Sequence, residues 1–179
     1  MNIFYLHPNP TTCAAYHADK HVVKMILEYA QLLSTAHRVI DGTQFTDASS
    51  GRKIQRWQMP DSYREDSLYK ATHVNHPSAV WCRASSGNYS WLYSLFIACG
   101  TEYTFRYGKT HLTISKLADV LEFTPDKIPI GEFTEPTQAM PDEVKIPGNS
   151  LQAYRNYYKI NKAEIATWKV RPVPEWFTT

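Results

Sequence analysis

Residues 12–39, TCAAYHADKHVVKMILEYAQLLSTAHRV, are the stretch of the chain that decides the fold. At about 100° per residue, polar side chains spaced by four, three, four and three fall within one narrow arc of a helix. The spacing therefore predicts one helix over residues 12–39 with a polar stripe along it. The stripe consists of His17, His21, Lys24, Glu28 and Gln31.

Apolar side chains flank this stripe on both sides, so the helix is expected to be buried nearly all round. Ionisable groups are seldom fully buried without partners, and burial shifts their pKa values in the way that catalytic sites exploit. We therefore expect the stripe to form the floor of a functional site. The flanking residues are Val22, Met25, Ile26, Tyr29, Leu32, Leu33 and Ala36 on one side and Val23, Leu27 and Ala30 on the other.

The length of 179 residues predicts a single domain over residues 1–179 that can bury a core without disulfides or a metal. Cys13, Cys82 and Cys99 share no CxxC spacing, which favours a reducing, cytoplasmic compartment and argues against a thiolate metal site. No apolar stretch approaches the roughly 18 residues that span a bilayer. We expect no membrane segment, no metal and no cofactor.

Helical periodicity recurs over residues 77–107, where Asn75 or His76 can cap the helix and Pro77 suits its first position. Shorter helices are expected over residues 113–122 and about 150–168. The predicted fold is all-α, a compact single-domain helical bundle with two long packed helices and long irregular connections.

Two long connections have weak periodicity. Residues 41–75 form an excursion of the kind that often contacts ligands. Residues 124–149 contain five prolines and most of the acidic charge, which predicts either an ordered wrapping loop or a mobile flap.

Lys24 and Glu28 lie one helical turn apart on the stripe and are the first candidates for catalysis. A buried carboxylate can act as general acid or base, and a lysine amine can form a Schiff base with a carbonyl-like carbon. The same spacing also gives an internal ion pair without catalytic function.

Four histidines are candidate ligand contacts. His17 and His21 have metal-chelating spacing, but the segment lacks the Glu that follows the first His in zinc-peptidase helices, so we expect hydrogen-bonded histidines there. His73 and His76 precede the second long helix, whose free N–H groups attract phosphate. Simple capping of this helix is the alternative.

Two basic, aromatic clusters could contact a nucleic-acid backbone, with an exposed ring stacking on a base. Solvated surface is the alternative interpretation of each cluster. The first contains Arg52, Lys53, Arg56 and Trp57, and the second contains Tyr154, Arg155 and Tyr158.

The segment Ala18-Asp19-Lys20-His21-Val22, with Glu28 seven residues after the histidine, resembles the first helix of the pyrimidine-dimer DNA glycosylases of the phage endonuclease V type. Leu6-His7-Pro8 is similar to a segment of bacterial relatives. The Tyr-rich basic segment 154–159 also resembles that family. The resemblance covers about the first 40 residues and implies a compact helical domain.

The resemblance implies a bifunctional enzyme. In that family the N-terminal α-amine attacks the sugar carbon that bears the damaged base, a Schiff base forms, and a glutamate assists base loss and strand cleavage. Glu28 corresponds to this glutamate and His21 to the active-site histidine. The family exposes its amine by removing the initiator Met before a small residue, whereas Asn2 follows here. The implied nucleophile is therefore the amine of Met1 or that of Lys24.

These observations give one favoured function and two alternatives. The favoured function is a DNA-repair glycosylase with abasic-site lyase activity on damaged pyrimidines in duplex DNA, acting in the host cytoplasm if the protein is phage-encoded. The first alternative is a phage-type protein that binds or hydrolyses a free nucleotide or a nucleotide-derived signal, which a net charge of only +2 favours. The second is a structural protein whose stripe is paired internally.

Overall fold

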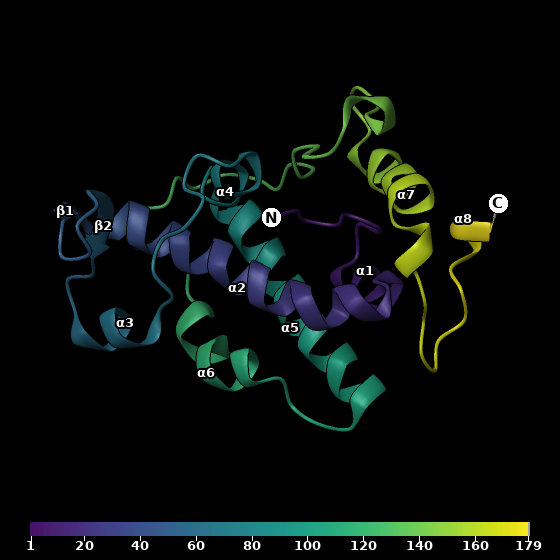
Figure 1. Cartoon of the computed structure of the whole chain (residues 1–179), viewed down its shortest axis with the longest axis horizontal. Coiled ribbons are helices and arrows are strands. Elements are labelled where there is room, and N and C mark those ends of the chain that lie inside the picture. Colours follow the sequence, from purple (N-terminus) through teal and green to yellow (C-terminus); the bar gives the residue numbers. More distant parts are fainter. Residues whose placement is uncertain (179) are drawn as a thin grey trace.

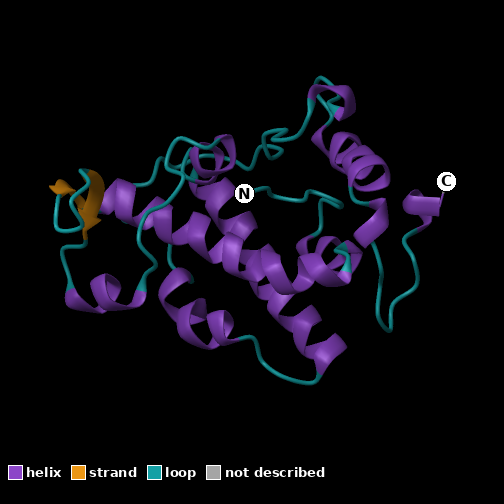
Figure 2. Ribbon diagram, in the orientation of Figure 1, coloured by secondary structure: helices purple, strands orange, loops and turns teal. Residues whose placement is uncertain are grey.

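The computed structural model describes residues 1–178 and is mostly helical (Figures 1 and 2). Within that range it contains eight α-helices and one sheet of two strands. The expected helical character is confirmed, but the sheet shows that the fold is not purely all-α. No helix in the described range is long and apolar enough to cross a membrane.

The predicted helix over residues 12–39 is two helices, α1 (Pro10–Tyr16) and α2 (Asp19–Asp41). The chain leaves the helical conformation at His17, whose ψ is 133°. His17 Nδ1 bonds the Cys13 carbonyl at 2.7 Å, and the His17 N–H bonds Ala14 instead. The His17 imidazole thus bonds the Cys13 carbonyl in place of the His17 backbone N–H, and α1 ends there. The prediction that His17 lies on the same helix as Glu28 is wrong.

The second predicted long helix is also interrupted. It consists of α4 (Pro77–Cys82) and α5 (Ser86–Tyr107). His76 caps α4 as predicted, and Ser85 caps α5 by accepting a hydrogen bond from the Asn88 N–H. A side chain that caps a helix start competes with continuing the preceding helix. The predicted helix over residues 113–122 is α6 (Leu112–Leu121).

Residues 41–75 contain a β-hairpin that the sequence analysis did not predict. Strands β1 (Thr43–Asp47) and β2 (Ile54–Gln58) pair antiparallel, and the hairpin extends from the C-terminal end of α2 (Figure 1). Most of its residues are exposed or half-buried, so neither face imposes the alternation of apolar and polar residues that marks a strand. Helix α3 (Ser62–Ser67) follows the hairpin.

The proline-rich connection over residues 124–149 is hydrogen-bonded to the start of α5. The N–H groups of Ser86 and Gly87 donate to Pro129 and Gly131. A Cβ at Gly87 would lie 2.5 Å from the Phe133 nitrogen, so only glycine permits this close passage. The connection contains the 3-10 turn η1 (Asp142–Val144) and contacts the start of α5 through these hydrogen bonds.

The end of the chain contains three short helical elements. Asn149 caps α7 (Ser150–Asn161) as predicted, but α7 ends before residue 168 and is followed by η2 (Ala163–Ile165) and α8 (Glu175–Thr178). Helices α2 and α5 pack against each other at the centre, and α1 also packs against α5. Buried residues of the N-terminal segment 3–6 complete this core.

Arg38 holds the region after α2 in place. Its guanidinium is almost fully buried and donates five hydrogen bonds to segment 57–69. Four acceptors are backbone carbonyls, and the fifth is the Glu65 carboxylate at 2.7 Å. The fork of an arginine satisfies several carbonyls at once, which a lysine cannot do.

We expect Arg38→Lys to lower the free energy of unfolding by about 3–5 kcal/mol, because buried carbonyls and a carboxylate lose their donors. Urea unfolding monitored by circular dichroism would measure the change. Arg52→Lys is the control, since Arg52 is exposed in the hairpin turn and the substitution should change stability by less than about 0.5 kcal/mol. A loss in Arg38→Lys no larger than in this control would contradict the assignment.

Candidate functional site

Lys24 and Glu28 form an ion pair on α2, with Nζ and Oε1 separated by 3.0 Å. The Lys24 side chain is 67% exposed, whereas that of Glu28 is 15% exposed. Val23 and Leu27 are also exposed, at 39% and 40%, so the prediction that this helix is buried nearly all round is wrong. Glu28 therefore lies at the border between the core and an open face of α2.

His76 is the residue on which the charges of both the Met1 α-amine and this carboxylate act. The pKa of His76 is lowered by burial first, then by the positive charges of the Met1 amine and His73, while Glu28 opposes the shift. The Met1 carbonyl accepts a hydrogen bond from Ser78 Oγ at 3.3 Å, which attaches the start of the chain to α4. The charges of an amine, a second imidazole and a carboxylate therefore all act on His76.

The N-terminal segment is held in position by its own buried contacts. Phe4 stacks on His21 with ring centroids 4.3 Å apart, and the Phe4 carbonyl accepts a hydrogen bond from Cys13 Sγ. Arg155 donates from Nε and Nη2 to the Leu6 carbonyl. Both ends of segment 4–6 are fixed in this way, and the Ser78 hydrogen bond fixes Met1 against α4.

The His21 side chain is buried beneath the candidate site and is not exposed to solvent. It is 6% exposed and bonds the Tyr158 hydroxyl at 2.6 Å. Burial first, and then the electrostatic effect of His17, Lys162 and Lys24, lowers the pKa of His21 to about 3. The ring is therefore neutral near pH 7 and is suited to positioning Phe4.

Several residues predicted to contact a ligand belong to the core instead. His17, Tyr154 and Tyr158 have no exposed surface, so they cannot touch a ligand in this conformation. His17 Nε2 bonds Tyr29, and the Tyr154 hydroxyl donates to the Thr137 carbonyl. These three ligand predictions are wrong, because local periodicity does not report which side of an element another segment covers.

Arg155 and Gln31 have different positions. The Arg155 guanidinium lies 5.3 Å from the centre of the Trp176 ring and is engaged with Leu6, so it positions the N-terminal segment. Gln31 is half-buried on α2, three residues after Glu28, as the spacing predicts.

The first basic cluster lies on the hairpin, with Arg52 and Lys53 exposed in its turn. Arg56 and Trp57 are half-buried on β2 and line a hollow of about 510 Å³. His73 lines the same hollow, and its charge also acts on His76.

Sequence reasoning missed other residues around this hollow. Gln44 and Gln55 line it from the two strands, and their side chains form a hydrogen bond of 3.0 Å across the hairpin. Asn75 lines it from the opposite segment. The glycine between the two strands, Gly51, has a φ of 78° and was the signal for a turn that would have revealed the hairpin.

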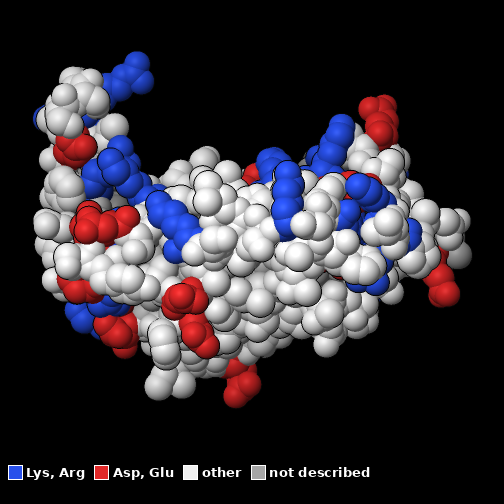
Figure 3. All heavy atoms as spheres, turned by 90° about the horizontal axis from the view of Figure 1, so that it is seen from below, with Lys and Arg blue, Asp and Glu red and all other residues white. Residues whose placement is uncertain are grey.

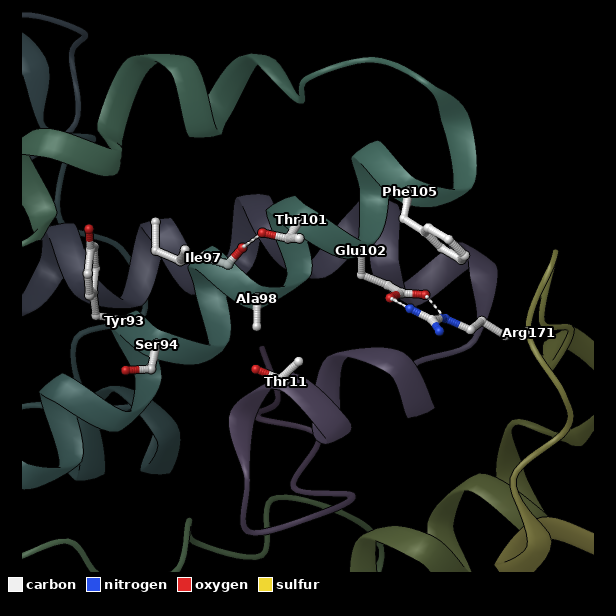
Figure 4. Close-up of a pocket in the computed structure, with 9 residues that line it drawn as sticks. All are labelled: Thr11, Tyr93, Ser94, Ile97, Ala98, Thr101, Glu102, Phe105 and Arg171. Carbon is white, nitrogen blue, oxygen red and sulfur yellow. Dashed lines mark hydrogen bonds and ion pairs between the residues drawn. The ribbon is translucent and has the colours of Figure 1, made fainter.

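A separate hollow of about 470 Å³ lies beside α5 and contains the Glu102–Arg171 ion pair (Figure 4). Glu102 also accepts from Arg106, and the Arg171 guanidinium lies 4.2 Å from the centre of the Phe105 ring. Its charged groups already have partners within the chain. This hollow is therefore a weaker candidate for catalysis than the Met1, His76 and Glu28 group.

Basic side chains gather along a concave edge of the molecule. Figure 3 shows this edge at the top of the view, between the projecting hairpin and the opposite end of the chain. Among residues 1–178, no group of three or more His, Cys, Asp or Glu is placed to hold a metal ion.

No family model, curated protein or solved structure matches this chain.

The buried histidines predict a dependence of stability on pH. Burial lowers the pKa of His17 to about 4 and that of His21 to about 3, against 6.5 in the unfolded chain. Their stabilising contribution is complete above pH 6.5 and is lost as the pH falls toward 4, because only the unfolded chain takes up the protons. Each histidine contributes a slope of up to about 1.4 kcal/mol per pH unit.

Urea unfolding at intervals between pH 7 and pH 4.5 would measure this slope. His21→Gln should reduce it, because this removes one of the titrating histidines, which also include His37 with its pKa lowered to about 4. A free energy of unfolding that does not change with pH over this range would contradict the burial of neutral histidines.

Proposed function

We propose that this protein is a DNA glycosylase with abasic-site lyase activity on damaged pyrimidines in duplex DNA. The observation that carries the proposal is that the charges of the Met1 α-amine and of Glu28 both act on His76. An amine beside a carboxylate is the minimum required to form a Schiff base with a sugar carbon and to move the accompanying protons. The resemblance of segment 18–28 to phage endonuclease V-type enzymes agrees with this chemistry.

In the proposed reaction the Met1 nitrogen bonds C1′ of the damaged nucleotide. The glycosidic bond between C1′ and the damaged base breaks. The base leaves with the electron pair of this bond and takes up a proton. The amine loses one proton, the C1′–O4′ bond breaks as O4′ takes up a proton, and a protonated imine forms between the nitrogen and C1′. Removal of a C2′ proton then expels the 3′-phosphate. Glu28, at the border of the open face, is the group that accepts and returns protons.

Lys24 is the competing nucleophile, but its position favours another role. Its Nζ is engaged by Glu28 at 3.0 Å, and most of its side chain faces solvent. The Met1 amine instead begins a buried segment fixed by Phe4 and Leu6. Preorganisation of a reacting group accounts for a large part of a catalysed rate, which favours Met1.

The surface charge supports a polyanionic substrate. Lys and Arg side chains follow the concave edge in Figure 3, and Arg52 and Lys53 are exposed on the hairpin at its end. The Lys24 side chain is exposed to solvent on the open face of α2. A concave basic edge can follow a duplex backbone even though the net charge is only +2.

The hollow at the hairpin favours the second candidate function, binding or hydrolysis of a free nucleotide or a nucleotide-derived signal. Its volume of about 510 Å³ lies within the range of small-molecule sites. Trp57 offers a ring that could stack on a base, and Arg56 and His73 offer donors for phosphate.

Glu28→Gln should lower glycosylase and lyase activity at least about 100-fold, because the amide keeps the shape but cannot transfer a proton. Activity on duplex DNA containing a pyrimidine dimer would be measured beside the far-UV spectrum and the melting temperature. Glu143→Gln, on the exposed turn η1, is the matched control and should retain full activity. Full activity in Glu28→Gln would remove this carboxylate from the mechanism.

Borohydride reduction in the presence of abasic duplex DNA should trap a covalent adduct, and peptide mapping should place it on Met1. A Gly-Ser extension before Met1 should abolish trapping, because it moves the amine away from Glu28. The same extension after residue 179 is the control. An adduct on Lys24 would reassign the nucleophile, and no adduct under any condition would rule out the lyase.

Arg52→Ala with Lys53→Ala should weaken duplex binding and reduce its salt dependence by roughly two units, one for each lost phosphate contact. Fluorescence anisotropy at several salt concentrations would measure the slope. Lys109→Ala with Lys127→Ala removes the same charge from other exposed positions and should have less effect. Tight binding of mononucleotides without duplex binding would favour the nucleotide-binding function.

A further inference from the structure

A hollow of about 500 Å³ lies where α3, the C-terminal end of α6 and residues 122–126 meet. It is separate from the group formed by Met1, His76 and Glu28. In Figure 3, which faces the side of α3 and α6, acidic side chains gather on the left of the view, below the concave basic edge. The proposed reaction uses none of the residues in this hollow.

The buried end of the hollow holds a hydrogen-bond acceptor without a donor. His37 lines the hollow and is 2% exposed, and its Nδ1 has no hydrogen-bond partner. The Tyr89 hydroxyl donates its single proton to the Leu121 carbonyl at 2.9 Å, so it accepts from His37 Nε2 at 2.8 Å. With this direction of donation, Nε2 carries the ring proton and Nδ1 is left as an acceptor.

The charge state of His37 agrees with this assignment. Burial lowers the pKa of His37 to about 4, with Asp41 raising it and Arg64 lowering it. The Phe123 backbone also acts on the ring and raises its pKa, although Nδ1 makes no hydrogen bond of good geometry. Near pH 7 the ring is neutral, and a buried acceptor of this kind favours a ligand that brings an N–H or O–H donor.

The charges around the hollow favour a cation. Arg64 is already engaged by Asp41, Asp61 and Asp126. The carboxylates of Asp119 and Glu122 also line the hollow, and neither has a hydrogen-bond or ion-pair partner among residues 1–178. Helix α6 ends at Leu121 beside them, and its negative dipole end adds to their field.

Two exposed aromatic rings complete the site. Tyr63 is 62% exposed and Phe123 is 73% exposed, and both line the hollow. The face of an aromatic ring attracts an ammonium or guanidinium group, and exposed apolar rings also cover the methylene groups that such cations carry.

We propose that this hollow binds an organic cation with N–H donors, either an alkylammonium or a guanidinium. The carboxylates of Asp119 and Glu122 attract the charge, His37 Nδ1 accepts one N–H, and the rings of Tyr63 and Phe123 contact the alkyl part. The cation is either a free polyamine or a basic side chain of a peptide. The site does not depend on the function proposed above.

Calorimetric titrations at pH 7 without DNA would use three probes at equal ionic strength. Spermidine represents a free polyamine, a blocked tripeptide with one central arginine represents a protein side chain, and tetramethylammonium is a cation without N–H donors. We expect spermidine or the tripeptide to bind at least about tenfold more tightly than tetramethylammonium. The ring 15N resonance of His37 Nδ1 should shift only with the probes that donate an N–H.

Asp119→Asn with Glu122→Gln should weaken binding at least about tenfold. Both positions are exposed, so this variant should fold. Asp142→Asn with Glu143→Gln removes the same charge at the exposed turn η1 and should bind like the parent protein.

The preferred probe identifies the source of the cation, a polyamine or a peptide side chain. Equal binding of tetramethylammonium, unchanged binding in the Asp119 and Glu122 variant, an unmoved His37 resonance, or no binding of any probe would each overturn the proposal.

Discussion

The buried guanidinium of Arg106 is the interaction on which the arrangement of helices depends. Its side chain has no exposed surface, and it donates to Glu102 on its own helix at 2.6 Å, to Asp19 at the start of α2 at 2.9 Å, and to the Ala15 carbonyl of α1. Glu102 also receives Arg171 from the C-terminal segment. One cation therefore joins α1, α2, α5 and the end of the chain. Removing a partner from such a network leaves an uncompensated buried charge, which is far more costly than losing an exposed ion pair.

The junction that Arg106 stabilises lies at the break between α1 and α2. Because α1 ends at His17, the preceding segment turns back along the molecule and packs Phe4 against His21. A continuous helix over residues 12–39 would not permit this return. The position of Met1 against α4, where its amine acts on His76, thus accompanies a helix break. A buried structural network and the candidate reactive group are coupled through the same few residues.

The small net charge of the chain hides two surfaces of opposite character. Basic side chains follow the concave edge, and acidic side chains gather near α3 and the end of α6 (Figure 3). Separation of charge on this scale lets one small domain attract a polyanion at one place and an organic cation at another. The two hollows involved belong to different elements, the hairpin with segment 71–75 and α3 with α6.

The sequence by itself determined the features that depend on neighbours along the chain. These include the Lys24–Glu28 pair one turn apart, the caps at His76 and Asn149, and the mainly helical character. Local spacing and capping chemistry are readable because the interacting groups lie within four residues of each other. Tertiary structure alone decided which polar groups reach solvent, since His21 bonds Tyr158 across 137 residues of chain. Burial of this kind is set by which distant segment covers a helix, and no periodicity within the helix carries that information.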